Sequence, residues 1–123
     1  ESDRLAATSL LAETYACYGV LKGPGSVLFT AQEHAICAQG NAGMATAGMG
    51  DVLSGIAGAL VAEVAANGDA DLAELNYAFQ SAVLWHSAAA DLAAVKLGPR
   101  SLMATDVISL LPRAGRSAEL NKV

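Results

Sequence analysis

Glycines are dense between residues 40 and 51, and the stretch ends in a carboxylate. It contains Gly40, Gly43, Gly48 and Gly50, and Asp51 follows directly. Glycine allows positive φ angles and lets a ligand approach the backbone closely. The next segment has apolar residues at helical spacing, namely Leu53, Ile56, Leu60 and Val64. The pattern predicts a glycine-rich loop that leads into the N-terminus of a helix.

This junction could bind phosphate or another anion. The first amides of a helix lack intrahelical acceptors, and the helix dipole adds about half a unit of positive charge there. The amides near Gly48, Met49, Gly50 and Asp51 could therefore face a phosphoryl group in transfer. Asp51 would stay ionised and could accept a proton from an attacking hydroxyl of the substrate. The structural alternative is a plain loop whose Asp only caps the helix.

A second glycine-containing turn, KGPGS, occupies residues 22–26. It follows a short apolar run, residues 17–22, that is typical of a buried strand. Because ligands of α/β proteins gather beyond the carboxyl ends of strands, Lys22 could contact a nucleotide there, and Ser26 offers a hydroxyl. The alternative is a solvated lysine before a turn.

The elements around these motifs follow from apolar periodicity. Residues 3–16 read as an amphipathic helix with Ser2 as its cap. Two runs with high β propensity, residues 26–30 and 34–38, are separated by three residues and predict a hairpin. His34 begins the second run and is expected at the surface.

Two further helices are expected after the one that begins near Asp51 and ends at Asn67 and Gly68. Asp69 or Asp71 could cap the first of them, which should extend to about Lys96 before the stop formed by Leu97, Gly98 and Pro99. The second is a short helix capped by Thr105 and closed by Pro112 after Leu111. Residues 114–123 are expected to form a frayed tail.

Four residues invite a functional assignment but are better explained by structure. His86 and Trp85 fall on the apolar side of the predicted helix that ends near Lys96, so both are expected in the core. Cys17 and Cys37 lie in apolar surroundings and are expected to be free, buried thiols. No group of His, Cys and carboxylates has metal-ligand spacing, so we expect no protein-held metal.

Composition restricts the protein to a few classes. The 123 residues are 54% apolar and 15% charged, which favours one compact domain over disorder. A net charge of -5 argues against nucleic acid or an anionic membrane as the main partner. We expect no apolar run of membrane-spanning length, and the amino end is charged rather than signal-like. A cytoplasmic protein is therefore expected.

The run GNAGMATAGMGDVLSGIAGAL, residues 40–60, resembles the signature of the ADP- or ATP-dependent NAD(P)H-hydrate dehydratases, a branch of the ribokinase-like superfamily. The resemblance extends over nearly all of residues 1–120 and matches the C-terminal half of that domain. It implies a three-layer αβα ribokinase-like fold, of which residues 1–123 are the C-terminal portion. The earlier family segment, with several strands and a His-Pro-Gly-Glu turn, has no counterpart in this sequence.

The resemblance also implies an activity. The family phosphorylates a hydroxyl on the hydrated nicotinamide ring, eliminates phosphate and so restores NADH or NADPH. By resemblance, Lys22, Gly23, Pro24, Gly25 and Ser26 contact the adenine nucleotide, with Ser26 replacing the usual threonine. Gly48, Met49 and Gly50 form the anion hole, with Gly50 also at the nucleotide and Met49 where many members have threonine.

In this scheme Asp51 contacts the substrate and acts as the base. ADP or ATP is the phosphoryl donor, Mg²⁺ accompanies its phosphates, and the intact protein is expected to be a homo-oligomer. Two alternatives stay open, namely a hydroxymethylpyrimidine, thiazole or sugar kinase of the same superfamily, and a packing module without catalysis. Half of a domain could also be inactive by itself and expose apolar surface.

Overall fold

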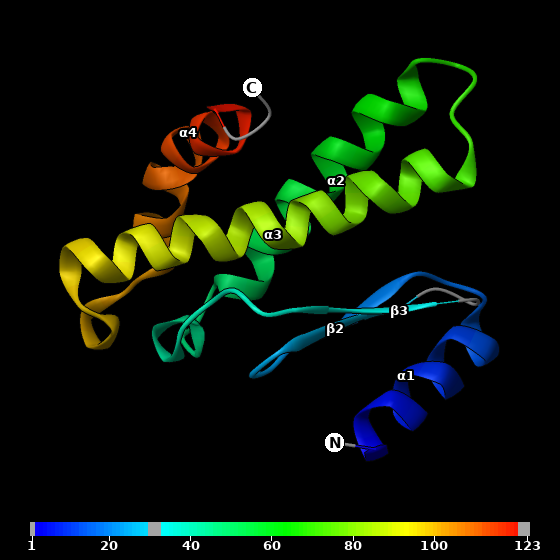
Figure 1. Cartoon of the computed structure of the whole chain (residues 1–123), viewed down its shortest axis with the longest axis horizontal. Coiled ribbons are helices and arrows are strands. Elements are labelled where there is room, and N and C mark those ends of the chain that lie inside the picture. The colour runs from blue at the N-terminus through cyan, green and yellow to red at the C-terminus, as the bar shows by residue number, and fades with distance from the viewer. Residues whose placement is uncertain (1, 30–32, 121–123) are drawn as a thin grey trace. The chain divides into compact units, whose positions relative to one another are not determined.

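The computed structural model describes residues 2–29 and 33–120. The chain divides into two compact units, Glu1–Ala38 and Gln39–Val123, and each is described by itself (Figure 1). The first unit is a small α/β unit and the second is helical. The described chain is thus mixed α/β, mostly helical, with a small sheet.

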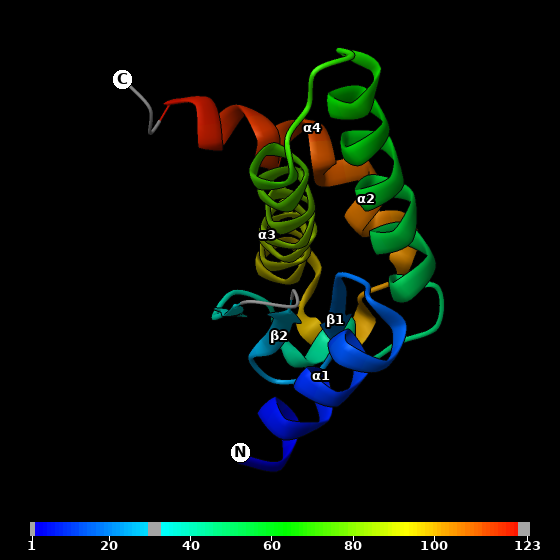
Figure 2. The same cartoon turned by 90° about the vertical axis from the view of Figure 1, so that its right-hand side faces the viewer.

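The first unit is one helix on a three-stranded sheet. Helix α1 (Ser2–Tyr15) packs against β1 (Gly19–Leu21) and β2 (Ser26–Phe29), and β3 (His34–Cys37) completes the sheet (Figure 2). The strands are antiparallel in the order β1-β2-β3. The predicted helix and hairpin are confirmed, although α1 already includes Ser2, so Ser2 does not precede it as a cap. The strand expected over residues 17–22 is shorter and only half-buried.

The core of this unit comes from one face of α1, from β2 and from the end of β3. Its buried members are Thr8, Ala12, Val27, Leu28, Phe29 and Cys37. The Thr8 hydroxyl donates to the Leu5 carbonyl at 2.8 Å, so its burial leaves no unpaired donor. Gly19 faces Phe29 across the sheet, where a side chain would collide with the aromatic ring. Both cysteines are free, but Cys17 is exposed, so the expectation that both are buried is wrong for Cys17.

Three helices form the second unit. Helix α2 (Met49–Ala66) and α3 (Leu72–Leu97) pack together as neighbours, and α4 (Ala104–Leu120) packs on α3 (Figures 1 and 2). Two single-turn 3₁₀ helices, η1 (Ala42–Met44) and η2 (Pro99–Ser101), lie before α2 and before α4 and contact each other. As predicted, α2 ends at Asn67 and Gly68, and Gly98 ends α3.

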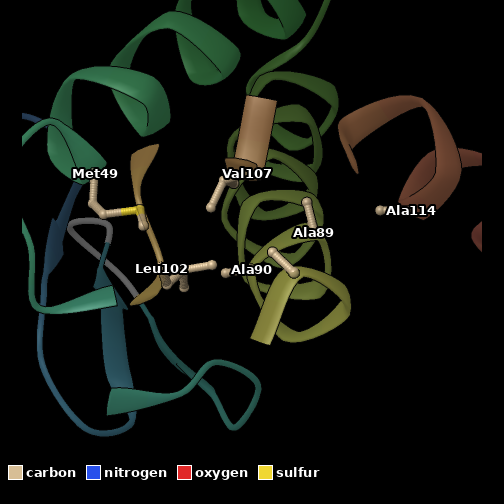
Figure 3. Close-up of a cluster of buried hydrophobic side chains, with 7 residues drawn as sticks. Met49, Ala89, Ala90, Leu102, Val107 and Ala114 are labelled. Atoms are coloured by element: carbon tan, nitrogen blue, oxygen red, sulfur yellow. The ribbon is translucent and has the colours of Figure 1, made fainter. Parts of the chain in front are cut away.

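Alanines on α3 form the centre of the core of this unit. Ala89, Ala90 and Ala93 are fully buried, and Leu102 and Val107 fill the space against them (Figure 3). The remaining members of the cluster are Met49 at the start of α2 and Ala114 in α4. As expected, Trp85 packs on this cluster and His86 is buried. The Trp85 Nε1–H donates to the Leu111 carbonyl at 2.7 Å.

The prediction for the C-terminal helix is wrong at both ends. Helix α4 begins at Ala104, so Thr105 lies inside it, and Asp106 accepts the Met103 amide at 2.9 Å. Pro112 lies within the helix instead of closing it. A proline costs one intrahelical hydrogen bond, but the Trp85 bond to Leu111 just before it and the buried Ala114 just after it hold the helix on α3. The tail expected from residue 114 is helical as far as Leu120.

The expectation about apolar runs is also wrong. Among the described residues, α2 is long and apolar enough to cross a membrane by length and composition, and few of its residues are buried within this chain. The core helix of a water-soluble protein passes the same test. Asp51 in the first turn and Glu63 near the end interrupt the apolar composition of this helix.

Asp71, rather than Asp69, caps α3. Its carboxylate accepts the Glu74 amide at 2.8 Å, and the Glu74 carboxylate accepts the Asp71 amide at 3.1 Å, which completes a capping box. We predict that Asp71→Ala lowers the free energy of unfolding by about 1 kcal/mol. Chemical denaturation measures it, with Asp69→Ala as the matched control. Equal effects of the two substitutions would contradict the assignment.

Candidate active site

The glycine loop enters α2 through a left-handed residue. Gly48 is the N-cap with φ of 82°, a conformation that disfavours other residues. Its carbonyl accepts the Val52 amide at 3.0 Å, which closes the first turn. Within the described part of the chain, no acceptor is found for the amides of Met49, Gly50 and Asp51. These three amides thus follow the rule that the first amides of a helix have no intrahelical acceptor.

Asp51 lies in the first turn of α2 and is exposed. Gly48 receives no side-chain cap, and the described residues donate no hydrogen bond to the Asp51 carboxylate. Among the described residues, Asp51 therefore makes no capping hydrogen bond at the start of α2. Met49, by contrast, points into the core cluster and is buried (Figure 3). The Met49 side chain therefore anchors the first turn of α2 in the core of this unit.

A carboxylate on α3 holds the start of the glycine loop. Asp91 accepts the Gly40 amide at 3.0 Å and the Asn41 side-chain amide at 2.8 Å. Asn41 is the N-cap of η1, and its side-chain oxygen accepts the Gly43 amide at 3.0 Å. Sequence reasoning missed both residues. Asn41 lies inside the glycine run and could have been singled out as an N-cap, but no sequence signal links it to a residue 50 positions away.

Two glycines of the loop are required by close packing. A side chain at Gly43 would collide with the Pro99 carbonyl of η2 and would crowd Leu102. A side chain at Gly48 would crowd Ala104 at the start of α4. Met44 between them packs on the core cluster. The loop is therefore fixed against the C-terminal end of α3, η2 and the start of α4.

The second motif is the hairpin loop between β1 and β2. Gly23 has φ of 152° and Gly25 has φ of 62°, and the Ser26 hydroxyl donates to the Gly23 carbonyl at 3.2 Å. Lys22 is exposed at its start. The strands here are antiparallel, so the rule for parallel sheets that placed Lys22 beyond a strand end does not apply. The role of Lys22 therefore depends on the resemblance.

Arg4 of α1 fixes this hairpin loop, and sequence reasoning did not anticipate it. Its Nη1 donates to the Pro24 carbonyl at 2.8 Å and its Nη2 donates to the Leu21 carbonyl at 3.1 Å. The guanidinium thereby joins the carbonyl at the end of β1 to a carbonyl inside the hairpin loop. The two motifs lie in different units, residues 22–26 in the first and residues 48–51 in the second, and each is described on its own.

Other candidate groups lie outside both motifs. The described residues include no cluster of three or more His, Cys, Asp or Glu side chains that could hold a metal ion. His34 is exposed, as expected, with Nε2 3.4 Å from the Ser9 hydroxyl. His86 is in the core of the second unit rather than at the loop surface. Neither histidine is placed at the start of α2.

A left-handed glycine, helix-start amides and an exposed carboxylate thus meet in the first turn of α2. Comparison with known proteins specifies the family. The family model described as NAD(P)H-hydrate dehydratase matches residues 1–113. The chain therefore belongs to the NAD(P)H-hydrate dehydratase family.

Individual relatives agree. The bifunctional NAD(P)H-hydrate repair enzyme of Escherichia coli is 43% identical over 114 residues, which are 92% of this chain and 21% of that protein. The Vibrio cholerae enzyme of the same name is 44% identical over 108 residues, 88% of this chain and 20% of that protein. A solved ADP/ATP-dependent NAD(P)H-hydrate dehydratase from Bacillus subtilis, co-crystallized with ATP/Mg²⁺, matches 94% of this chain and 39% of its own with a TM-score of 0.80.

The sequence identity to that structure is 23%, so this match shows the fold alone. The chain spans about a fifth of the length of the bifunctional relatives it matches and about two fifths of the solved chain. The expected family is confirmed, and the fold of this mixed α/β chain matches part of the solved dehydratase.

The contact between Gly43 and η2 can be tested by adding one methyl group. We predict that Gly43→Ala lowers the free energy of unfolding by about 1–3 kcal/mol, because the backbone carbonyl of Pro99 must move. Thermal unfolding followed by circular dichroism measures the change. Ala47→Ser, at an exposed position of the same loop, is the control. A Gly43→Ala protein as stable as the control would refute the close contact.

Proposed function

We propose that this chain supplies the phosphoryl-transfer part of an ADP- or ATP-dependent dehydratase that converts hydrated NADH or NADPH back to the intact cofactor. The observation that carries the proposal is the start of α2, where open amides and the exposed Asp51 carboxylate meet in one turn. Membership of the dehydratase family favours this activity over the hydroxymethylpyrimidine, thiazole and sugar kinases.

The first chemical step is transfer of a phosphoryl group to the hydroxyl of the hydrated nicotinamide ring. Asp51 accepts the hydroxyl proton as the oxygen attacks phosphorus, and the bond from phosphorus to the nucleotide oxygen breaks. The amides of Met49, Gly50 and Asp51 face the transferred group and stabilise its charge. Elimination of phosphate then restores the ring, so that a kinase-like site performs a lyase reaction.

The hairpin loop of residues 22–26 is proposed as the nucleotide contact. Lys22 offers an exposed cation, and Arg4 holds the loop in place through the carbonyls of Leu21 and Pro24. The related Bacillus subtilis enzyme was crystallised with ATP/Mg²⁺. In this chain Mg²⁺ would be held by the nucleotide phosphates, since phosphate oxygens are its usual ligands.

The proposed domain is larger than this chain. We propose a three-layer αβα domain whose C-terminal portion is residues 1–123, since the matched solved chain is about two and a half times as long. Packing of further segments on α2 would also account for the apolar face that this helix exposes here. Assays of activity therefore require the complete protein that carries this chain.

The base role of Asp51 predicts a separation of binding from turnover. Asp51→Asn in the complete protein should keep nucleotide affinity and lower turnover roughly 10²–10⁴-fold, because the amide cannot accept the proton. Recovery of NADH absorbance from hydrated NADH with ADP or ATP measures turnover, and isothermal titration measures binding. Asp69→Asn, at an exposed aspartate beyond the end of α2, is the control.

Normal turnover in Asp51→Asn would refute the base role. A wild-type protein that binds no adenine nucleotide would instead support the packing module, and one that phosphorylates a small alcohol without restoring NADH would support a kinase.

The nucleotide contact is tested separately. Lys22→Ala should raise the Kd for ADP or ATP roughly tenfold, the effect of losing about 1.4 kcal/mol from a charge-assisted phosphate contact. Lys96→Ala, an exposed lysine in the last turn of α3, removes the same charge elsewhere and should leave the Kd unchanged. Equal Kd values for the two variants would place the nucleotide away from residues 22–26.

A further inference from the structure

We propose that Asn41 and Asp91 form a clamp that positions the glycine loop for phosphoryl transfer. The inference deepens the proposed function and rests on it, since the clamp serves the same loop. Neither residue is proposed to touch the substrate; both act through the backbone of residues 40–48. The clamp is the Asp91 carboxylate together with the Asn41 side-chain amide.

The clamp uses every polar atom of both side chains. One Asp91 oxygen accepts the Gly40 amide and the other accepts the Asn41 Nδ2 group, at 3.0 and 2.8 Å. The Asn41 Oδ1 atom accepts the Gly43 amide at 3.0 Å. The chain is therefore fixed at two amides, three residues apart, by one carboxylate and one carboxamide whose donors and acceptors match.

The position of the Asp91 carboxylate is itself determined by the core. Its neighbour Ala90 and the nearby Ala93 are fully buried, so this turn of α3 is fixed by close packing. A side chain on such a turn is a rigid reference point for a loop. Gly40, whose amide Asp91 binds, has φ of 112°, and a side chain there would crowd Met44. Position 40 therefore favours glycine.

The other end of the loop is the start of α2. Between the clamp and Gly48, Gly43 lies against Pro99 and Met44 packs on the core, and only the three exposed residues 45–47 connect this anchored part to the open amides. A displacement at residues 40–43 would be passed to residues 48–51 through this short connection. Misplacing reacting groups by about 1 Å can cost roughly 100-fold in rate.

The matched chemistry allows an exchange experiment in the complete protein. Asn41→Asp alone places two carboxylates face to face. Asp91→Asn alone places two side-chain amide groups face to face. If the Asn41 side chain turns over to avoid this, the Gly43 amide loses its acceptor. In the double variant Asn41→Asp/Asp91→Asn, the new amide at position 91 can donate to the new carboxylate at position 41 and accept the Gly40 amide. The Gly43 amide keeps an acceptor.

We expect each single variant to lower kcat roughly 10-fold to 100-fold with little change in the KM for nucleotide, and the double variant to recover most of kcat. The Asp71→Ala variant removes a carboxylate cap of α3 away from the loop and controls for lost stability, with kcat expected to be unchanged. Wild-type kcat in both single variants, or no recovery in a folded double variant, would overturn the clamp.

Hydrogen exchange separates failure of the clamp from failure of the proposed function. In folded single variants, exchange of the Gly40 and Gly43 amides should accelerate roughly tenfold and return toward wild-type rates in the double variant. Unchanged exchange in the single variants would overturn the clamp whatever the activity. A wild-type protein that does not dehydrate hydrated NADH but shows this exchange pattern would refute the dehydratase assignment and keep the clamp.

Discussion

Close packing against the alanines of α3 is the constraint on which the second unit depends. Ala89, Ala90 and Ala93 add almost no side-chain length, so neighbouring segments approach the helix backbone closely. Leu102 and Val107 fill the remaining space (Figure 3). Met49 belongs to the same cluster, so the turn that carries the open amides is part of the core rather than a loose connection. The geometry of the site follows from how well this core is packed.

The sequence was most informative where local chemistry decides the structure. Glycine spacing and the apolar periodicity after Asp51 predicted the loop, the start of α2 and the place of Asp51 in its first turn, because a helix start needs only local signals. The hairpin followed from β propensity alone. The choice between Asp69 and Asp71 as a cap stayed open because both precede the helix, and only the reciprocal bond with Glu74 decides it.

The parts that could not be predicted depend on contacts between distant residues. Pro112 is a local stop signal, but packing of Ala114 and the Trp85 bond to Leu111 outweigh it. Asp91 anchors Asn41, and Arg4 anchors the β1–β2 loop. Each contact joins segments that no sequence pattern connects. Because β1 and β2 pair antiparallel, the rule that ligands gather beyond the ends of parallel strands no longer supports a nucleotide contact at Lys22.

The Trp85 indole has a consequence for spectroscopy. The sequence contains a single tryptophan, its Nε1–H bonds the Leu111 carbonyl, and its ring lies within contact of Gly115. The emission of this fluorophore therefore reports one junction, the seat of α4 on α3, without any label. When α4 detaches, the ring enters water and its emission shifts to the red, so detachment of the C-terminal helix can be followed separately from loss of total helix content.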